Sequence, residues 1–511
     1  MPEPRLNVAS MKIYEILEDY QTGRLAVPEF QRDYVWRKSK APKLLDSLYR
    51  GYPVSSILLW EADDPAITPR RNEPRALKGP TVRWLIDGQQ RVMTLHRIRQ
   101  GEIEVMFNPS NGGQFSLVNA ANRNQRGWFC VADLWDDDRY RQISSDATES
   151  AARCLENVRR IFKEYEIPVV NMRGHNFEGA VEAFKRINTQ GVRLGSNDIQ
   201  SAEIAAKHSR FIAKEVLPFL EEVHGNGFDR LTIMHLFRVC AFLATPDERT
   251  RTPLRDLRRA TLLEAWKRTT RATERVIGAL RDRFGFVDMN VLWSGTLVVP
   301  LIIMVAMQET ENKVDFDEAL GWMALAAIRH RYTGSVDTAL TQDLRACRRD
   351  DPIAALLKNL RDAEKGGELG AGPGDFQANL GDRGAMLAAY IACRHRGMKS
   401  FRGQAVAGQA QIDRHHIWPR RHFDSDKRHL ADTVANIAFT LEEDNRSIGA
   451  EIPENYLAKI PPNVLDSQCI PNDRDLWKGD AKEEFWQERR RLLAEAFNDF
   501  VRKHLPHRKI L

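Results

Sequence analysis

Two adjacent histidines near the C-terminus, His415 and His416, constrain this chain more than any other feature of its sequence. They follow Asp413, and the segment closes at Pro419. A neutral imidazole is suited to activating water near neutral pH. A hard cation such as Mg²⁺ prefers oxygen ligands and keeps several waters, so one or two side chains suffice to hold it. The segment therefore indicates metal-assisted hydrolysis of phosphodiesters, at the end of a short strand.

Two asparagines downstream, Asn436 and Asn445, complete the pattern. Residue types, order and spacing together resemble the HNH, or ββα-metal, nuclease motif. The resemblance implies that His416 is the general base, and that His415 and Asn445 hold Mg²⁺ or Mn²⁺. It also implies that Asn436 pins the loop structurally. Asp413 is a further candidate ligand, because residues i and i+2 of a strand share a face.

The adjacency of the two histidines raises a geometric requirement. In a regular strand, neighbouring side chains point to opposite faces. The interpretation therefore requires the strand to bend at His415 and His416, which the approach to Pro419 permits. Ordinary surface histidines are the alternative for an isolated pair. No CxxC pair flanks the segment, so a structural zinc is not predicted.

The composition limits the setting of this site. With 511 residues, the chain has room for two or three domains with separate cores. Its six cysteines are scattered, as expected for thiols in a reducing cytoplasm. No signal peptide is expected from the first residues. The apolar stretch 291–307 contains Gly295 and Pro300 and is short for a bilayer, so we expect a buried helix and no membrane partner.

The charge distribution favours a nucleic-acid partner near the histidines. The net charge of +6 is mild, but residues 383–428 hold ten Lys or Arg against three Asp or Glu. A local basic surplus suits the phosphate backbone of double-stranded DNA. A solvated charged face is the alternative.

A second motif, Asp87-Gly88-Gln89-Gln90-Arg91, lies between an apolar strand and a helix. Backbone N–H groups at a helix start attract anions, and Gly88 lets the chain approach closely. Arg91 could clamp phosphates through a fork of charge-assisted hydrogen bonds. A glycine turn with a purely structural role is the alternative for this pentapeptide alone.

The order of elements around this motif resembles the ParB/sulfiredoxin-type nucleotide-binding fold. The D-G-Q-Q-R box more closely resembles the N-terminal domain of GmrSD-type type IV restriction enzymes, with a further box at residues 183–194. The resemblance implies a nucleoside triphosphate cofactor, with Asp87 and Arg91 catalytic. Its implied nucleotide-binding residues are Asp87, Gly88, Gln89, Gln90 and Arg91, then Gln31, Arg32, Arg186 and Asn188. For Arg186 and Asn188, a helix end closing over Gly191 is an equal alternative.

Periodicity and punctuation predict an α+β multidomain chain. Apolar spacing predicts a first helix over residues 8–20, and helical periodicity dominates from Asp198 to about Lys365. The glycine-rich segment Glu364–Asp375 is typical of an interdomain linker. We therefore expect three parts. They are a ParB/sulfiredoxin-like α/β nucleotide-binding domain (1–200), a helical region (201–365) and an HNH endonuclease domain (376–511).

Both ends resemble the two subunits of GmrSD fused in one chain. This implies a cytoplasmic endonuclease of anti-phage defence, acting on modified phage DNA and gated by nucleoside triphosphate binding or hydrolysis. One alternative is an SspE-like nicking nuclease that senses phosphorothioate. Another is a non-enzymatic ParB-like DNA clamp with a decayed nuclease, against which the complete set of candidate residues argues. Four properties stay open at this point: the DNA modification that is recognised, the nucleotide that is preferred, whether the cut is a nick or a double-strand break, and whether the chain forms a homo-oligomer.

Overall fold

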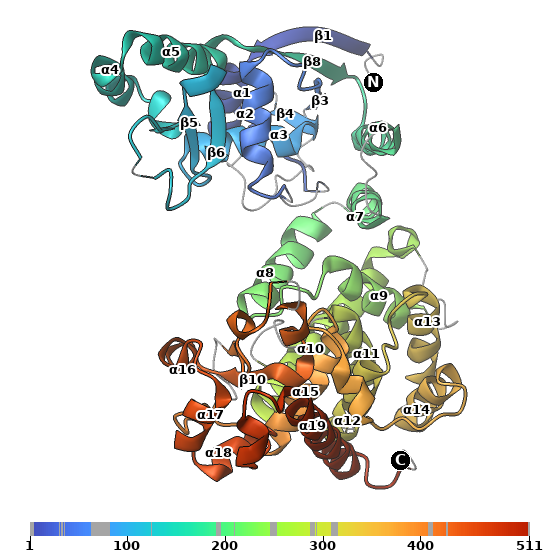
Figure 1. The fold of residues 1–511 in the computed structure, drawn as a ribbon. Coiled ribbons are helices and arrows are strands. Elements are labelled where there is room, and N and C mark those ends of the chain that lie inside the picture. The colour runs from blue at the N-terminus through green and yellow to red at the C-terminus, as the bar shows by residue number, and fades with distance from the viewer. Residues whose placement is uncertain are drawn as a thin grey trace. The chain divides into compact units, whose positions relative to one another are not determined.

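The structure, a computed structural model, describes residues 5–508 except 30, 32–33, 35, 63–81, 124, 191–195, 209, 246–252, 287–291, 293, 308–314, 407–411 and 426–427. It divides into two compact units, Met1–Pro218 and Phe219–Leu511, coloured in chain order in Figure 1. About 59% of it is helical, with a sheet region in the N-terminal part. The predicted mixed α+β class is therefore confirmed.

A five-stranded mixed sheet forms the frame of the first unit, in the order β1-β8-β3-β4-β2. Its strands are β1 (Arg5–Lys12), β2 (Leu25–Ala26), β3 (Ile57–Ala62), β4 (Val82–Asp87) and β8 (Glu166–Arg173). The pairs β1–β8 and β3–β4 are antiparallel, whereas β3–β8 and β2–β4 are parallel. The end of β4 carries the second predicted motif into a helix.

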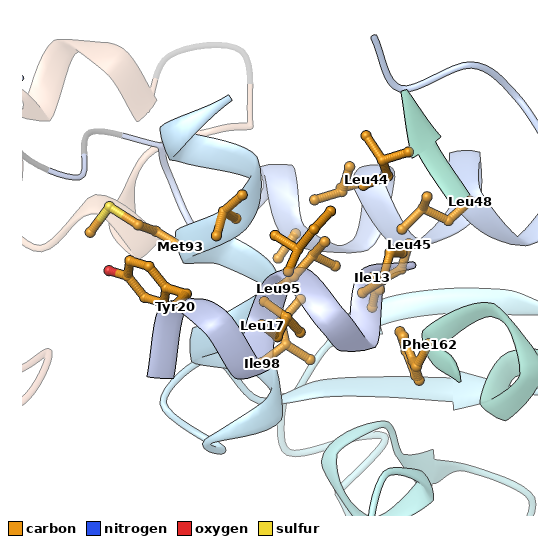
Figure 2. Close-up of a cluster of buried hydrophobic side chains, with 14 of the residues drawn as sticks. Ile13, Leu17, Tyr20, Leu44, Leu45, Leu48, Met93, Leu95, Ile98 and Phe162 are labelled. Carbon is orange, nitrogen blue, oxygen red and sulfur yellow. The ribbon is translucent and has the colours of Figure 1, made fainter. Parts of the chain in front are cut away.

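One face of this sheet packs against helices to form the core of the first unit. Figure 2 shows apolar side chains of α1, α2, α3 and α5 meeting there. In α1, Ile13, Leu17 and Tyr20 recur at helical spacing and are buried. The helices of this unit are α1 (Ile13–Gln21), α2 (Lys40–Tyr49), α3 (Gln89–Arg99), α4 (Asp137–Asp146), α5 (Glu149–Glu164), α6 (Phe177–Gln190) and α7 (Ser196–Lys207). A three-stranded antiparallel sheet joins β5 (Val105–Asn108), β6 (Gln114–Leu117) and β7 (Phe129–Cys130).

The predicted first helix over residues 8–20 is wrong in its first part. Residues 5–12 form strand β1 instead, paired along their length with β8. The helix begins only at Ile13. Local periodicity does not reveal this strand, because its partner lies more than 150 residues later in the chain.

The second unit is mainly helical. Its helices are α8 (Leu217–Gly225), α9 (Ile233–Ala244), α10 (Arg259–Phe284), α11 (Val299–Met307), α12 (Phe316–Ile328), α13 (Val336–Ala346), α14 (Pro352–Ala363), α15 (Arg383–His395), α16 (Glu442–Ile448), α17 (Pro453–Tyr456), α18 (Pro462–Ser467) and α19 (Lys482–His504). Two short strands, β9 (Asp413–His416) and β10 (Ile437–Thr440), pair antiparallel. Helix α15 packs against α12 and α19. A Cβ on Gly384 of α15 would lie 2.3 Å from the Ala327 carbonyl oxygen, so this close approach requires glycine.

The buried helix expected in the apolar stretch 291–307 is present in its second half as α11, after a 3₁₀ turn at Gly295–Val298; residues 291 and 293 lie outside the described residues. The α11 residues from Val299 to Ala306 are all buried. Among the described residues, no helix is both long and apolar enough to cross a membrane.

The glycine-rich segment Glu364–Asp375, the predicted interdomain linker, makes contacts with helices on both sides of it in the sequence. Arg329 donates hydrogen bonds to the carbonyls of Leu369 and Gly370 and pairs with Asp375. Asn498 of α19 donates to the Ala371 carbonyl at 2.9 Å and accepts from its N–H at 2.8 Å. Side chains distant in sequence therefore hold the backbone of this segment. The predicted parts 201–365 and 376–511 lie largely within one compact unit.

Candidate active site

The predicted C-terminal residues lie on two antiparallel strands and the helix that follows them. In the register of β9 and β10, His416 is opposite Ile437 and His415 is opposite Ala438. Helix α16 begins two residues after β10, carries Asn445 and packs against β9. This arrangement brings His415, Asp413 and Asn445 together, although 32 positions separate the last two.

His415 faces the interior of the second unit and is 1% exposed. Its Nδ1 lies 2.8 Å from Asn445 Oδ1, and its Nε2 lies 3.3 Å from the hydroxyl of Tyr456. The rings of Phe401 and Tyr456 meet the imidazole edge to face. Burial lowers the pKa of His415, because charge is costly to bury. His415 is therefore held as a neutral imidazole, the form that ligates metals.

The hydrogen bonds around His415 fix the direction of its possible ligand atoms. The Asn445 amide nitrogen donates to Asp413 Oδ2 at 2.7 Å, which turns its carbonyl oxygen toward His415. The Tyr456 hydroxyl donates to the Ile417 carbonyl at 3.1 Å, so its oxygen can accept from His415 Nε2–H. In that tautomer, His415 Nδ1 and Asn445 Oδ1 face each other with lone pairs. In the other tautomer, Nδ1–H donates to Asn445.

The spacing of this pair of atoms is that of an ordinary hydrogen bond, and it is also compatible with two neighbouring ligands of an octahedral cation. Ligands at roughly 2.1 Å from Mg²⁺ in octahedral geometry place neighbouring ligand atoms about 3.0 Å apart. The observed 2.8 Å between His415 Nδ1 and Asn445 Oδ1 is close to this value. Across the described residues, no three His, Cys, Asp or Glu side chains group as metal ligands. One imidazole, one amide and one carboxylate thus suit a cation that keeps several waters, and the metal stays a prediction.

His416 points away from this group and has a partner of its own. Its Nε2 lies 3.0 Å from Asp432 Oδ1, and its side chain is 25% exposed. The other Asp432 oxygen accepts from Arg420 at 2.7 Å. The strand stays regular through His416, and the chain bends only at Ile417 and Trp418. The predicted bend at the histidine pair is therefore wrong, and His415 and His416 occupy opposite faces of β9.

Asn436 uses every hydrogen-bonding group of its side chain. It is fully buried, and its Oδ1 accepts from the Trp418 backbone N–H at 2.8 Å and from the Trp486 indole at 3.2 Å. Its Nδ2 donates to the carbonyls of Trp418 at 2.9 Å and Ala431 at 2.8 Å. Asn436 thus ties the turn after β9 to helix α19.

Sequence patterns gave no signal for three residues around this site. Asp432 lies in a loop, Tyr456 ends a short helix, and Arg489 is hidden in the apolar stripe of α19. Arg489 is fully buried, and its guanidinium donates to the carbonyls of Ala435 and Ile437, which braces β10. Only the folded chain brings these groups to the histidines.

In the first unit, the predicted D-G-Q-Q-R box forms the junction between β4 and α3. Gly88 caps α3 with a φ of 96° in the left-handed region, which favours glycine. A Cβ at this position would also lie 2.9 Å from Ile57 Cγ1. The side chain of Asp87 is 34% exposed. Glycine is therefore required here by both backbone conformation and space.

Arg91 makes contacts that the phosphate-clamp prediction did not include. Its guanidinium donates to the carbonyls of Val54, Ser55 and Ser56, the last two at 2.8 and 2.7 Å. It also contacts Asp87 at 3.2 Å. Burial lowers the pKa of Arg91, although Asp87 acts in the opposite direction. A phosphate would have to compete with these carbonyls for the same donors.

The glutamines of this region are also engaged with the protein. Gln31 donates to the Ile86 carbonyl at 2.7 Å, and Gln90 accepts from the Trp36 N–H at 3.2 Å. Gln89 is buried beside Met93. Arg186 is exposed on α6 and pairs with Glu182 at 2.8 Å. Arg32 and the side chain of Asn188 lie outside the described residues.

Comparison with known proteins identifies the class of the first unit. Residues 13–205 match the family model for the GmrSD restriction endonuclease, N-terminal domain. Residues 13–205 are therefore similar to a GmrSD-type N-terminal domain, which confirms the resemblance predicted for this part of the chain. An uncharacterized protein of Methanocaldococcus jannaschii is 20% identical over an alignment of 548 positions. That similarity covers 91% of this chain and 90% of the other, so it extends through both units.

Proposed function

We propose that this chain is a DNA endonuclease of prokaryotic defence against phage, with its phosphodiester-cutting site on β9, β10 and α16. The observation that carries the proposal is the convergence of His415, Asp413 and Asn445 on one face of β9, with His416, the next residue of the strand, held by a carboxylate on the other face. The GmrSD-type N-terminal domain supports the restriction class and DNA as the partner. Modified phage DNA as the target is part of the proposal.

In the proposed reaction, His416 takes a proton from a water molecule through Nδ1, since Nε2 is occupied by Asp432. The water oxygen forms a bond to phosphorus, and the bond to the leaving oxygen of the cut strand breaks. His415 and Asn445 would hold Mg²⁺ or Mn²⁺ beside the scissile phosphate. The cation, when bound, stabilises the charge that develops on the leaving oxygen.

The basic surplus around the site is smaller in the folded chain than in the sequence. Arg396 pairs with Asp466 at 2.7 Å, and Arg420 pairs with Asp432 at the same distance. Arg402 contacts the buried carboxylate of Asp444 at 3.1 Å. DNA binding therefore depends on how these pairs open toward phosphate, and not on the net count of charges.

The nucleotide-dependent gate belongs to the same proposal. Its support is the partly exposed Asp87 at the start of α3, within a domain of the GmrSD type. A nucleotide can favour an active state only through its different affinity for the two states. DNA cleavage should then require a nucleoside triphosphate. Asp87→Asn should lower the rate at which that nucleotide is hydrolysed.

The test of the nuclease is cleavage by the purified full chain, with Mg²⁺ or Mn²⁺ and each nucleoside triphosphate in turn. The substrates are plasmid and phage DNAs with defined base modifications. His416→Ala should lower the rate roughly a hundredfold or more, in line with positioned proton transfer. His422→Ala is the matched control, because His422 is an exposed histidine in the 3₁₀ turn that follows β9 and its ring contacts the backbone carbonyl of Ala450. Equal cleavage by His416→Ala and wild type would refute the assignment.

A further inference from the structure

The carboxylate of Asp432 contacts two side chains, His416 through one oxygen and Arg420 through the other. It lies just after a short 3₁₀ turn, Arg428–Ala431, in the loop that leads to β10. Its backbone N–H donates to the His429 carbonyl at 3.1 Å, and its carbonyl accepts from Leu380 N–H at 3.0 Å. Both backbone hydrogen-bonding groups of Asp432 are therefore engaged, which fixes the position from which its carboxylate contacts His416.

The chemistry of this contact fixes the proton on the imidazole. An ionised carboxylate only accepts hydrogen bonds. The 3.0 Å contact between Asp432 Oδ1 and His416 Nε2 therefore places the ring proton on Nε2. In the neutral imidazole the lone pair is then on Nδ1, the nitrogen that can accept a proton from water. Arg420 contacts the other Asp432 oxygen at 2.7 Å, so both carboxylate oxygens have partners.

We infer that Asp432 is a positioning residue of this site: it holds His416 in one tautomer and one orientation for proton transfer through Nδ1. The inference rests on the proposed nuclease function. Asp432 touches neither water nor phosphate in this role and acts only through His416. Its removal should therefore slow the chemical step without weakening DNA binding.

The test compares Asp432→Asn with wild type in DNA cleavage at saturating metal ion. Asn can donate to Nε2 as well as accept, so it no longer selects one tautomer. We expect kcat to fall roughly 10–100-fold, a part of the usual contribution of general-base catalysis. KM for DNA should not rise, because the substitution also releases Arg420 from its ion pair and so leaves it available to phosphate. Asp475→Asn is the matched control, because Asp475 is an exposed aspartate paired with Lys478 in the same unit.

A double variant separates positioning from a structural role. If Asp432 acts through His416, the variant with both Asp432→Asn and His416→Ala should cleave as slowly as His416→Ala alone. Asp432→Glu should recover part of the activity. Histidine-labelled NMR of wild type should show His416 protonated at Nε2, and Asp432→Asn should lose this preference.

The outcomes distinguish this inference from the function on which it rests. Normal cleavage by Asp432→Asn, beside inactive His416→Ala, would overturn the inference and leave the nuclease proposal standing. Losses that add in the double variant, or a raised KM with unchanged kcat, would also overturn it. A wild type that leaves every tested DNA intact would overturn the nuclease proposal, and the inference with it.

Discussion

Arg91→Ala should destabilise the first unit even when no nucleotide is bound. The guanidinium is held by three backbone carbonyls, and its side chain is only 13% exposed. At roughly 1 kcal/mol net for each hydrogen bond, the loss is about 3 kcal/mol. Ser55, in the segment that Arg91 holds, has a φ of 70°, a backbone conformation that non-glycine residues rarely adopt. Without Arg91, the segment from Val54 to Ser56 should therefore relax.

Hydrogen exchange measured by mass spectrometry can locate this effect in the full chain. Peptides covering residues 52–60 and 88–99 should exchange faster in Arg91→Ala, whereas peptides of the second unit should not change. Arg91→Lys is the matched control, because it keeps the charge but has no planar fork to bridge three carbonyls. We expect an intermediate loss of protection for it.

Wild-type protection at residues 52–60 in Arg91→Ala would show that the hydrogen bonds of Arg91 do not hold this segment. The guanidinium would then be free for phosphate, as the sequence suggested. If protection is lost, reduced nucleotide hydrolysis by Arg91→Ala does not identify a phosphate contact. Asp87→Asn is then the more informative variant for nucleotide hydrolysis, because Asp87 is partly exposed and makes only one of the contacts to the Arg91 guanidinium.

Two further predictions concern the second unit. Mn²⁺ at a hundred times its dissociation constant for wild type should stabilise wild type by about 2.7 kcal/mol. In a thermal unfolding assay at the same Mn²⁺ concentration, Asn445→Ala should lose this gain. Equal stabilisation of both proteins would exclude Asn445 as a ligand. Burial lowers the pKa of His235 to about 4, and its Nδ1 accepts from the Thr232 N–H at 3.0 Å. The neutral imidazole therefore stabilises the fold above pH 6.5, and up to about 3 kcal/mol should be lost as the pH falls to 4. Denaturant unfolding of His235→Gln should be less sensitive over this range, and an unchanged pH dependence would contradict the assignment.

Local signals in the sequence predicted much of the fold around the D-G-Q-Q-R box. The apolar run before Asp87 predicted a strand, and β4 spans Val82–Asp87. The following helix begins at Gln89 because Gly88 adopts a left-handed conformation that caps it. These features depend on neighbouring residues, so they are visible in one stretch of sequence. The carbonyls that hold Arg91 lie about 35 residues earlier and left no such signal.

The C-terminal candidate site shows the same division between local and long-range information. The order of His415, Asn436 and Asn445 predicted which side chains to consider, and two of them meet in the fold. Asp432 and Tyr456 could not be found this way, because an aspartate in a loop and a tyrosine in a short helix are common. Their importance arises only from contacts made across 16 and 41 positions.

The opposite orientations of His415 and His416 limit how a substrate can bind. Each imidazole has its own partner, Asn445 on one face of β9 and Asp432 on the other. If His416 activates water for a phosphate held beside Asn445, the phosphodiester must pass around the C-terminal end of β9. The chain bends there at Ile417 and Trp418, so the regular strand ends at the point where the substrate must reach both of its faces. Asn436 holds this bend through hydrogen bonds to the backbone N–H and carbonyl of Trp418. Its role in cleavage would then be to maintain the bend around which the phosphodiester passes.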